Sequence, residues 1–374
     1  MKKKLYYLIG ALIVGVLLVE SCIVPFAPPE VASADRFLVV DGFLNTGGKD
    51  SSRIQLGYTQ VVSNKNTFLT ELKATVTVEG DKGSTFTFTE IGKGLYRLAP
   101  RTFNEAEQFR VRVKTVGKKE YVSDYEAVKQ TPPIESITYK IADDKSGVYF
   151  YVNSQDPLNK TGYYRWRFEE TYEYHTPFFS SFEVKNKEIV DRLVSINRCW
   201  KTEKPATILL ASTTKLSKDV VREFPIVFVP ATSGKLIDKY SILVKQIGLT
   251  AAGFEYWNAL SKTTETTGSL FDPQPSQVTG NVKCVTNPQE LVFGFFSAYT
   301  PQEKRIFVAP YLGVSRTCMN GDTLSAADAI KSTDLIITEY LPEGARVPKY
   351  LMASPDCLDC RLGGGTIVRP TFWQ

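Results

Sequence analysis

Apolar and polar residues alternate along most of the chain in short runs, and this two-residue period is typical of β-strands with one buried face. The clearest pair is 74–79 and 85–90, joined by the turn residues 80–83, which together predict a hairpin. Short strands at regular spacing favour an immunoglobulin-like β-sandwich over residues 35–131. Its other strand candidates are residues 37–44, 53–60, 94–98 and 108–116.

A second, larger β-rich domain of fibronectin-like character is expected over residues 134–374, because Pro132 and Pro133 interrupt the pattern at the boundary. In its run 163–170, the aromatic residues occupy one face of the predicted strand and the charged residues occupy the other. The expected fold class is therefore mainly β. The further strand candidates of this domain are residues 147–153, 208–212, 226–229, 240–247, 291–298 and 304–308.

One helix is expected near residues 250–262, within the second domain. Thr250 is a candidate N-cap, and Phe254, Trp257 and Leu260 follow at spacings of three residues. We expect this helix to cover an edge or an end of a sheet.

The first 21 residues have the pattern of a secretory signal. Lys2, Lys3 and Lys4 precede an apolar run of roughly 15 residues, and Cys22 follows directly after a small residue. A cysteine in that place predicts a lipoprotein signal, in which the thiol receives a diacylglyceryl group. The alternative is a membrane-spanning helix, but the run is shorter than the roughly 20 apolar residues that a span needs. Residues 22–34 then form a lipidated, proline-rich tether.

Charge and length limit the classes of function. The chain has 374 residues and a net charge of +5, and loss of residues 1–21, with three lysines and one glutamate, lowers the charge to +3. This mild and evenly spread charge argues against a nucleic-acid partner.

The second half of the chain contains a set of characteristic sequence motifs. They are Cys199-Trp200, Phe254-Glu255-Tyr256-Trp257, Gly268-Ser269-Leu270-Phe271-Asp272-Pro273, Cys357-Leu358-Asp359-Cys360, Gly363-Gly364-Gly365 and Pro370-Thr371-Phe372-Trp373. With these motifs the chain resembles the family of Bacteroidota lipoproteins known as domain of unknown function 4249, over essentially residues 22–373. The resemblance implies a lipidated outer-membrane protein whose gene tends to lie beside genes for TonB-dependent receptors. It supplies no activity and no catalytic residues.

Five cysteines remain after Cys22. An oxidising envelope favours disulfides that link Cys199 and Cys318 to Cys357 and Cys360 and fasten the C-terminal tail. A four-sulfur zinc site and a redox motif at residues 357–360 are the weaker alternatives. Cys284 falls where the resembled family does not lead us to expect a cysteine, so it is the candidate free thiol.

No catalytic constellation is visible in the sequence. His175 is the only histidine, and no Gly-x-Ser-x-Gly motif supplies a nucleophile for it. Glu169 and Glu170 are adjacent in a strand and point to opposite faces, which makes them a poor acid/base pair. The acidic residues Asp143 and Asp144 are typical of a turn. We therefore expect no catalytic residue, no metal and no cofactor.

An aromatic cluster near His175 has two interpretations that the sequence leaves open. It could form an exposed recognition surface for a sugar or a protein, or it could pack against the core of its own domain. The cluster consists of Tyr172, Tyr174, Phe178, Phe179 and Phe182.

The function that fits these features best is a non-enzymatic, lipid-anchored envelope protein. It would serve as an accessory or binding partner of a TonB-dependent outer-membrane transporter or of another envelope assembly. The alternatives are a glycan or peptide hydrolase whose carboxylates converge only in the fold, and a structural stalk or adhesin. A deep pocket with two carboxylates favours the hydrolase, a flat aromatic patch favours binding, and a featureless surface favours the stalk. The sequence leaves both faces of the outer membrane open as the location of the protein, because the first acidic residue after Cys22 is Glu30.

Overall fold

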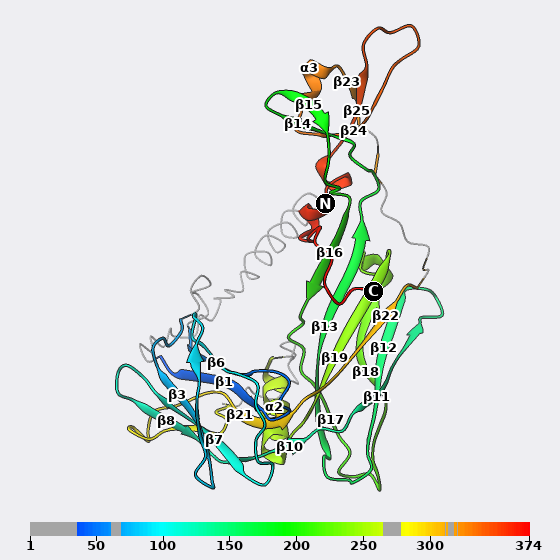
Figure 1. Ribbon diagram of the computed structural model, residues 1–374. Helices are drawn as coiled ribbons and strands as arrows, with labels where there is room; N and C mark the ends of the chain where they lie inside the picture. The colour runs from blue at the N-terminus through cyan, green and yellow to red at the C-terminus, as the bar shows by residue number, and fades with distance from the viewer. Residues whose placement is uncertain (1–35, 61–68, 265–277, 311, 313–317, 320) are drawn as a thin grey trace, which may run out of the picture. The chain divides into compact units, whose positions relative to one another are not determined.

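The computed structural model describes residues 36–60, 69–264, 278–310, 312, 318–319 and 321–374 (Figure 1). The predicted signal, the predicted lipidation site Cys22 and the predicted tether lie outside the described residues. The described chain is mainly β, as the alternating pattern predicts. No helix among the described residues is long and apolar enough to cross a membrane.

The N-terminal part is a sandwich of two sheets around one core. Leu38 and Val40 of the first sheet and Val76 and Val78 of the second are buried in that core, because alternate residues of each strand point inward. In the first sheet the order of the strands is β10 (Lys129–Gln130), β21 (Phe296–Thr300), β1 (Leu38–Asn45), β2 (Ser52–Tyr58), β6 (Leu95–Leu98) and β5 (Thr89–Glu90).

The second sheet of this sandwich contains the expected hairpin. Strands β3 and β4 pair antiparallel, with Val78 opposite Phe86, and the turn between them follows Gly80, the last residue of β3. The predicted run 85–90 does not stay in one sheet, since its end is β5, which pairs with β6 in the other sheet. The strands of the second sheet are β20 (Val282–Cys284), β8 (Glu120–Ser123), β7 (Gln108–Lys114), β3 (Thr75–Gly80) and β4 (Thr85–Thr87), with β9 (Glu126–Ala127) beside β7.

The first sandwich is not continuous in sequence. Strand β20 pairs with β8, and β21 pairs in parallel with β1, so that Phe296 lies opposite Gly42. Gly294, just before β21, has a φ of +106°, and a Cβ atom there would lie 1.9 Å from the carbonyl oxygen of Val40. Residues 134–374 therefore do not all belong to the second domain, and the boundary expected near residue 131 leaves out the strands that complete the first sandwich.

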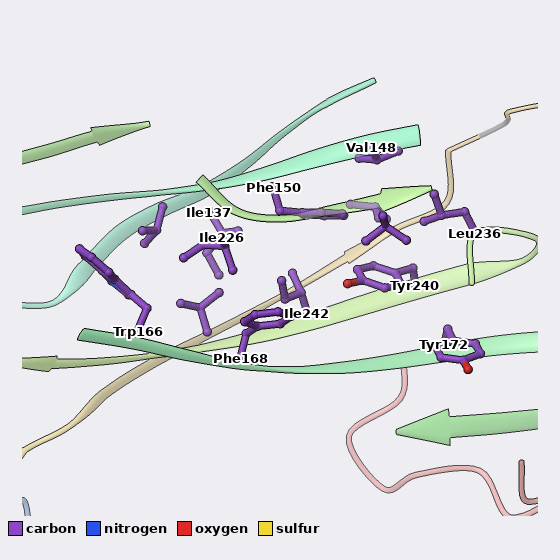
Figure 2. Packing of buried hydrophobic residues seen from close by; sticks show 14 of the residues in the cluster. Ile137, Val148, Phe150, Trp166, Phe168, Tyr172, Ile226, Leu236, Tyr240 and Ile242 are labelled. Atoms are coloured by element: carbon purple, nitrogen blue, oxygen red, sulfur yellow. The ribbon is translucent and has the colours of Figure 1, made fainter. Parts of the chain in front are cut away.

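The second sandwich packs a three-stranded sheet against a five-stranded sheet (Figure 2). Trp166, Phe168 and Tyr240 from the larger sheet meet Phe150 and Ile226 from the smaller sheet in the core. The three-stranded sheet has the order β11 (Ile134–Ile141), β12 (Gly147–Asp156) and β18 (Asp219–Pro230), and η1 (Ala231–Ser233) follows β18. The other sheet contains β16 (Arg198–Glu203), β13 (Tyr163–His175), β19 (Lys239–Gly248) and β22 (Gln302–Val308), with β17 (Leu209–Ser212) beside β13.

The expected helix is α2 (Ala251–Thr264). Thr250 caps it, because its side-chain oxygen accepts a hydrogen bond from the backbone N–H of Gly253 at 3.1 Å. The same hydroxyl donates to Glu126 Oε2 at 2.9 Å. Arg165 of β13 lies 3.3 Å from the ring centroid of Trp257, so the helix packs on the outer side of the larger sheet.

The proline-rich boundary between the sandwiches is buried and hydrogen bonded. Gln246 Nε2 donates to the carbonyl oxygen of Pro132 at 2.7 Å, and the N–H of Gly248 donates to Thr131 Oγ1 at 2.8 Å. Strand β19 of the second sandwich therefore holds the boundary segment directly, and residues 131–132 do not act as a free linker.

A small lobe extends from the ends of β13 and β16. Its core contains Ile336, Tyr350 and Met352, and Phe182 packs against them. The lobe includes a short second helix that the sequence analysis does not predict. Its elements are β14 (Phe182–Lys185), β15 (Glu188–Asp191), β23 (Thr323–Leu324), α3 (Ala326–Ala329), β24 (Leu335–Tyr340) and β25 (Lys349–Ala353), followed by η2 (Pro355–Cys357) and η3 (Cys360–Gly363).

Candidate functional site

The outer face of the three-stranded sheet carries a cluster of aromatic rings, two of which are exposed. In β12, Val148 and Phe150 point into the core, so Tyr149 and Tyr151 must point to the outer face. Strand β18 pairs antiparallel with β12 and places Phe228 opposite Tyr149. Paired residues share a face of the sheet, so the three rings gather on one surface, which we call the aromatic face.

The rings of the aromatic face contact one another. The centroids of Tyr149 and Phe228 lie 4.4 Å apart, and those of Tyr149 and Tyr151 lie 6.3 Å apart with an interplanar angle of 24°. Tyr149 is 40% exposed and Phe228 is 37% exposed. The rings therefore pack against one another, and Tyr149 and Phe228 keep part of their surface open to a ligand, while Tyr151 is half-buried.

An open pocket of about 360 Å³ adjoins the aromatic face at the hairpin between β11 and β12. The hairpin closes through a bond from the N–H of Ala142 to the carbonyl oxygen of Gly147 at 2.9 Å. Polar and aromatic side chains share the wall of this pocket, which gives it both stacking and hydrogen-bonding groups. The wall includes Lys140, Asp143, Asp144, Ser146, Tyr149 and Tyr151.

The acidic residues of this hairpin are turn residues, as the sequence suggests. Asp144 Oδ1 accepts a hydrogen bond from the N–H of Ser146 at 2.9 Å, and Lys145 between them has a φ of +58°. The hydrogen bonds from Ser146 lower the pKa of Asp144, so this carboxylate is charged at neutral pH. The turn places a fixed negative charge beside Tyr149.

The outer face of the larger sheet is different, because its charged side chains pair with one another. Lys245 Nζ lies 2.8 Å from Glu303 and 3.4 Å from Glu169, and Lys204 reaches Glu169 at 3.3 Å. The pKa of Glu169 is lowered, because these two lysines outweigh the effect of its partial burial. A solvated ion-pair network occupies this part of the face, and the partly exposed ring of Phe372 lies over Arg305 of the same face.

Most of the aromatic cluster near His175 packs inside the protein. Tyr172 and Tyr174 belong to the core of the second sandwich, Phe182 packs in the small lobe, and Phe178 lies against Leu358 and its neighbours. Phe179 is 54% exposed. The exposed recognition surface considered for these five residues is not formed, and the alternative of internal packing describes four of them.

His175 is tied to a carboxylate and to no nucleophile among the described residues. Its Nδ1 atom lies 2.6 Å from Asp238 Oδ2, and the side chain is 42% exposed. No serine hydroxyl or cysteine thiol of the described chain is hydrogen bonded to its ring. The geometry is that of a surface ion pair and lacks the third member of a hydrolase triad.

Glu169 and Glu170 point to opposite faces. Glu170 is 3% exposed and accepts hydrogen bonds from Tyr240 at 2.9 Å and Lys235 at 2.9 Å, while Glu169 joins the outer network. The two carboxylates therefore cannot flank one scissile bond.

Two other carboxylates, Asp156 and Asp219, lie opposite each other on β12 and β18. Asp219 accepts hydrogen bonds from Tyr164, Thr213 and Gly162 at 2.6 to 2.8 Å. Asp156 accepts three backbone N–H bonds and one from the Thr161 hydroxyl, each at 2.9 to 3.0 Å. Their oxygens are occupied by donors of the protein, so they fasten the loop after β12 and are not free for acid/base chemistry.

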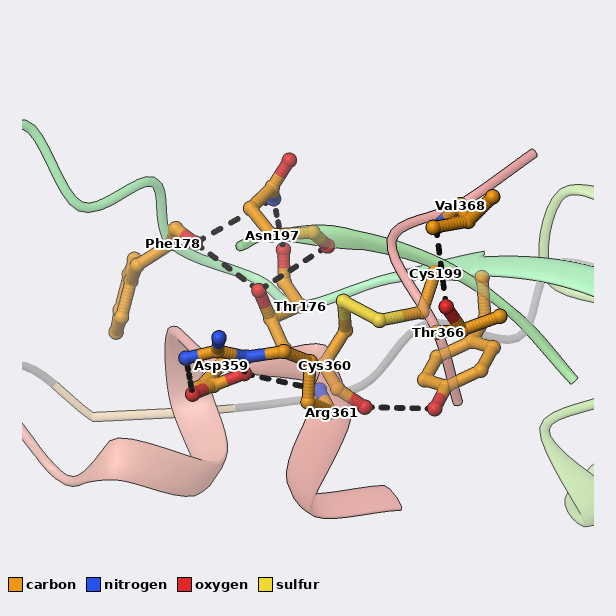
Figure 3. Close-up of a disulfide and its surroundings, with 10 residues drawn as sticks. Thr176, Phe178, Asn197, Cys199, Asp359, Cys360, Arg361, Thr366 and Val368 are labelled. Carbon is orange, nitrogen blue, oxygen red and sulfur yellow. Dashed lines mark hydrogen bonds and ion pairs between the residues drawn. A yellow bond between two sulfur atoms is a disulfide. The ribbon is translucent and has the colours of Figure 1, made fainter. Parts of the chain in front are cut away.

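The cysteines form the expected cross-links, and Figure 3 shows the one between Cys199 and Cys360. Cys199 pairs with Cys360, and Cys318 pairs with Cys357. The hydroxyl of Tyr174 donates to the carbonyl oxygen of Cys360 at 2.7 Å, which fixes the tail against β13. Cys284 is free and buried in the first sandwich. Among the described residues, no group of three or more histidine, cysteine or acidic side chains could hold a metal ion.

The sequence analysis misses the aromatic face. It treats residues 147–153 as a strand, in which Val148, Phe150 and Val152 alternate with Tyr149 and Tyr151. Both sets are apolar, so the pattern alone cannot tell a strand covered on both sides from one with an open side. The tyrosine hydroxyls are the signal in the sequence that could have identified the open side of the strand. Val148, Phe150 and Val152, at alternate positions, share one face, and the two tyrosines occupy the other.

Comparisons with known proteins give a family and no activity. A family model described as a domain of unknown function, number 4249, matches residues 23–305. No curated protein matches the sequence. Among solved structures, a crystal structure of a Salmonella alpha-2-macroglobulin mutant is similar at 13% identity and a TM-score of 0.18, over 59% of this chain and 14% of that chain. The chain thus spans a small part of that protein, and so low a score carries no argument about fold or function.

Proposed function

We propose that this chain, which belongs to the family of domain of unknown function 4249, is a non-enzymatic, lipid-anchored binding protein of the outer membrane. It serves as an accessory of a TonB-dependent transporter and holds a ligand for it. The observation that carries the proposal is the aromatic face, where the rings of Tyr149 and Phe228 are exposed and that of Tyr151 lies half-buried beside them. Exposed apolar rings in a cluster are typical of binding surfaces.

The lipid anchor and the transporter enter the proposal from the sequence. Lys2 to Lys4, the apolar run and Cys22 fit a lipoprotein signal, and the motifs of the second half resemble lipoproteins encoded beside such receptors. The proline-rich residues 23–34 suit a tether that holds the sandwiches away from the membrane. A protein that is anchored to the membrane and binds a ligand needs no catalytic group.

The hydrolase alternative has less support. Two carboxylate pairs of the described chain are unsuited to it, because Asp156 and Asp219 are committed to internal donors and Glu169 and Glu170 lie on opposite faces. The stalk alternative predicts a surface without an aromatic patch, which is unlike the outer face of β12 and β18.

Affinity purification tests the proposal. Tagged full-length protein is recovered from solubilised outer membranes, beside a variant with Tyr149→Ala, Tyr151→Ala and Phe228→Ala. Tyr139→Ala is the matched control, because Tyr139 is also exposed on β11 but pairs with Phe150 and so lies on the other side of the sheet. We expect a transporter to be recovered with the native protein and with the control. Recovery of no envelope transporter with the native protein contradicts the proposal.

A further inference from the structure

We infer that the aromatic face and its adjoining pocket form a binding site for a neutral carbohydrate chain. This inference rests on the proposed function and names the chemical class of the ligand. Its starting point is the combination of stacking rings with hydrogen-bonding side chains at one place in the fold, at Tyr149, Tyr151, Phe228 and the hairpin of residues 142–146.

The rings are placed for stacking against sugar rings. One side of a pyranose presents several C–H groups, and these carry partial positive charge that is attracted to the negative face of an aromatic ring. Tyr149 and Tyr151 are two residues apart on β12, and their planes differ by 24°. Tyr149 keeps part of its ring exposed on this face, so one sugar unit can stack there while the next unit of the chain reaches Tyr151.

Hydrogen-bonding groups surround this platform. Lys140 lies directly opposite Tyr149, and Thr138 lies opposite Tyr151 on the paired strand β11. Asp143 and Asp144 line the pocket at the hairpin. Among the described residues, neither Lys140 Nζ nor the Asp143 carboxylate has an ion pair, so both a donor and an acceptor are available to ligand hydroxyls.

The charges of the pocket favour a neutral ligand. Lys140 is the one cation of the pocket lining, and Asp143 and Asp144 supply two anions. A phosphate or a sugar acid would meet net repulsion, whereas neutral hydroxyls can accept from the lysine and donate to the carboxylates. A nucleotide could stack on the tyrosines, but its phosphates would oppose the same two carboxylates.

The size of the pocket suits a carbohydrate chain. A stable protein interface buries about 800 Å² on each side, so contact with a protein partner would extend beyond this pocket. The aromatic face offers three rings beside a pocket of about 360 Å³, which suits a few sugar units. A pair of residues farther along the strands, Ser136 and Asn153, is hydrogen bonded within the protein, because Asn153 Nδ2 donates to Ser136 Oγ at 3.1 Å.

Titration of the purified full chain with neutral oligosaccharides tests the inference. The probes are hexasaccharides of β-1,4-glucose, α-1,4-glucose, β-1,4-mannose and β-1,4-xylose, with a hexasaccharide of galacturonic acid as the charged comparison. Isothermal titration calorimetry measures the dissociation constants. We expect at least one neutral chain to bind and the charged chain not to bind. Tyr149→Ala and Tyr151→Ala should each weaken binding by about tenfold or more, because each removes a stacking ring.

Tyr139→Ala is the control for loss of an exposed tyrosine from the same sheet, and it should leave the dissociation constant unchanged. Lys140→Met should weaken binding of the neutral chain by a smaller factor than Tyr149→Ala or Tyr151→Ala does. Binding of none of the four neutral probes overturns the inference, as does binding that Tyr149→Ala and Tyr151→Ala leave unaltered. If no sugar binds while a transporter is still recovered through the aromatic face, the carbohydrate inference fails and the proposed function stands.

Discussion

Tyr149 and Phe228 face each other across β12 and β18 with ring centroids 4.4 Å apart, on the side of the sheet that points away from the core. Their neighbours Val148 and Val229 form the next pair and are buried. The small sheet of the second sandwich therefore carries apolar side chains on both faces. One is covered by the five-stranded sheet, and the other keeps its rings accessible.

An exposed cluster of this kind is costly in water, because the rings lose the benefit of burial. The charged outer face of the larger sheet, with Glu169 and Lys245, shows the usual solution for a solvated strand. The difference between the two outer faces is the basis for assigning the aromatic face a role in binding.

Loss of the charge of Lys235 should destabilise the second sandwich strongly. Lys235 Nζ lies 2.9 Å from Glu170 and 2.7 Å from Glu203, and these carboxylates raise the pKa of Lys235 against the opposing effect of burial. Lys235→Met leaves the buried Glu170 without its cation, which we expect to cost about 3–5 kcal/mol of unfolding free energy. Lys204→Met is the control, because Lys204 pairs on the exposed outer face and should change stability by less than about 1 kcal/mol. Urea unfolding measures both, and equal losses contradict the account.

Acid should destabilise the first sandwich through Glu79. Hydrogen bonds from Arg112, against the effect of burial, hold the pKa of Glu79 below its usual value of 4.5. The unfolded chain therefore takes up this proton first, and the stability that Glu79 contributes is present above about pH 4.5 and is lost as the pH falls toward the folded pKa. Glu79→Gln should flatten the fall of unfolding free energy below pH 4.5, as measured by urea titration at several pH values. Glu105→Gln, at an exposed position, should keep the native slope.

The disulfide pairing can be read directly from unreduced peptides. Mass spectrometry of a digest with trypsin and Asp-N, which cuts before Asp359 and so separates the two terminal cysteines, should find Cys199 linked to Cys360 and Cys318 linked to Cys357. The first bond closes a separation of 161 residues, for which the chain-entropy relation gives about 5 kcal/mol of stabilisation. A thiol reagent should label the buried Cys284 slowly in the native protein and rapidly in urea. Cross-linked peptides in the opposite pairing contradict the structure.

The cap of α2 gives a smaller prediction. Thr250→Val removes the acceptor for the Gly253 N–H and the donor to the buried Glu126, so unfolding free energy should fall by about 1–2 kcal/mol. Thr250→Ser retains the hydroxyl and should restore most of this stability. If the valine and serine variants unfold at the same urea concentration, the hydroxyl has no such role.

Several features were predictable from local pattern. The alternation of Tyr164, Trp166 and Phe168 with charged residues correctly places the core face of β13, and Thr250 begins the expected helix. These features depend on neighbouring residues alone, since strand periodicity and helix capping act within one element. The mainly β class follows from the same patterns.

Other features depend on contacts between distant residues. Nothing in residues 291–298 says that Phe296 pairs in parallel with Gly42 of the first sandwich, because strand propensity does not name a partner. In the same way, Tyr149 and Tyr151 look like part of a fully apolar strand until the second sheet is known to cover only the side of Val148 and Phe150. The candidate site is a consequence of tertiary packing.

Photo-cross-linking in intact cells tests most directly whether the aromatic face is the working surface. p-Benzoylphenylalanine is introduced as Tyr149→p-benzoylphenylalanine, and in a separate strain as Tyr139→p-benzoylphenylalanine on the other side of the same sheet. The account predicts an ultraviolet-dependent adduct of the full-length protein at position 149 and none at position 139. Adducts at position 139 alone, or at neither position, would contradict it.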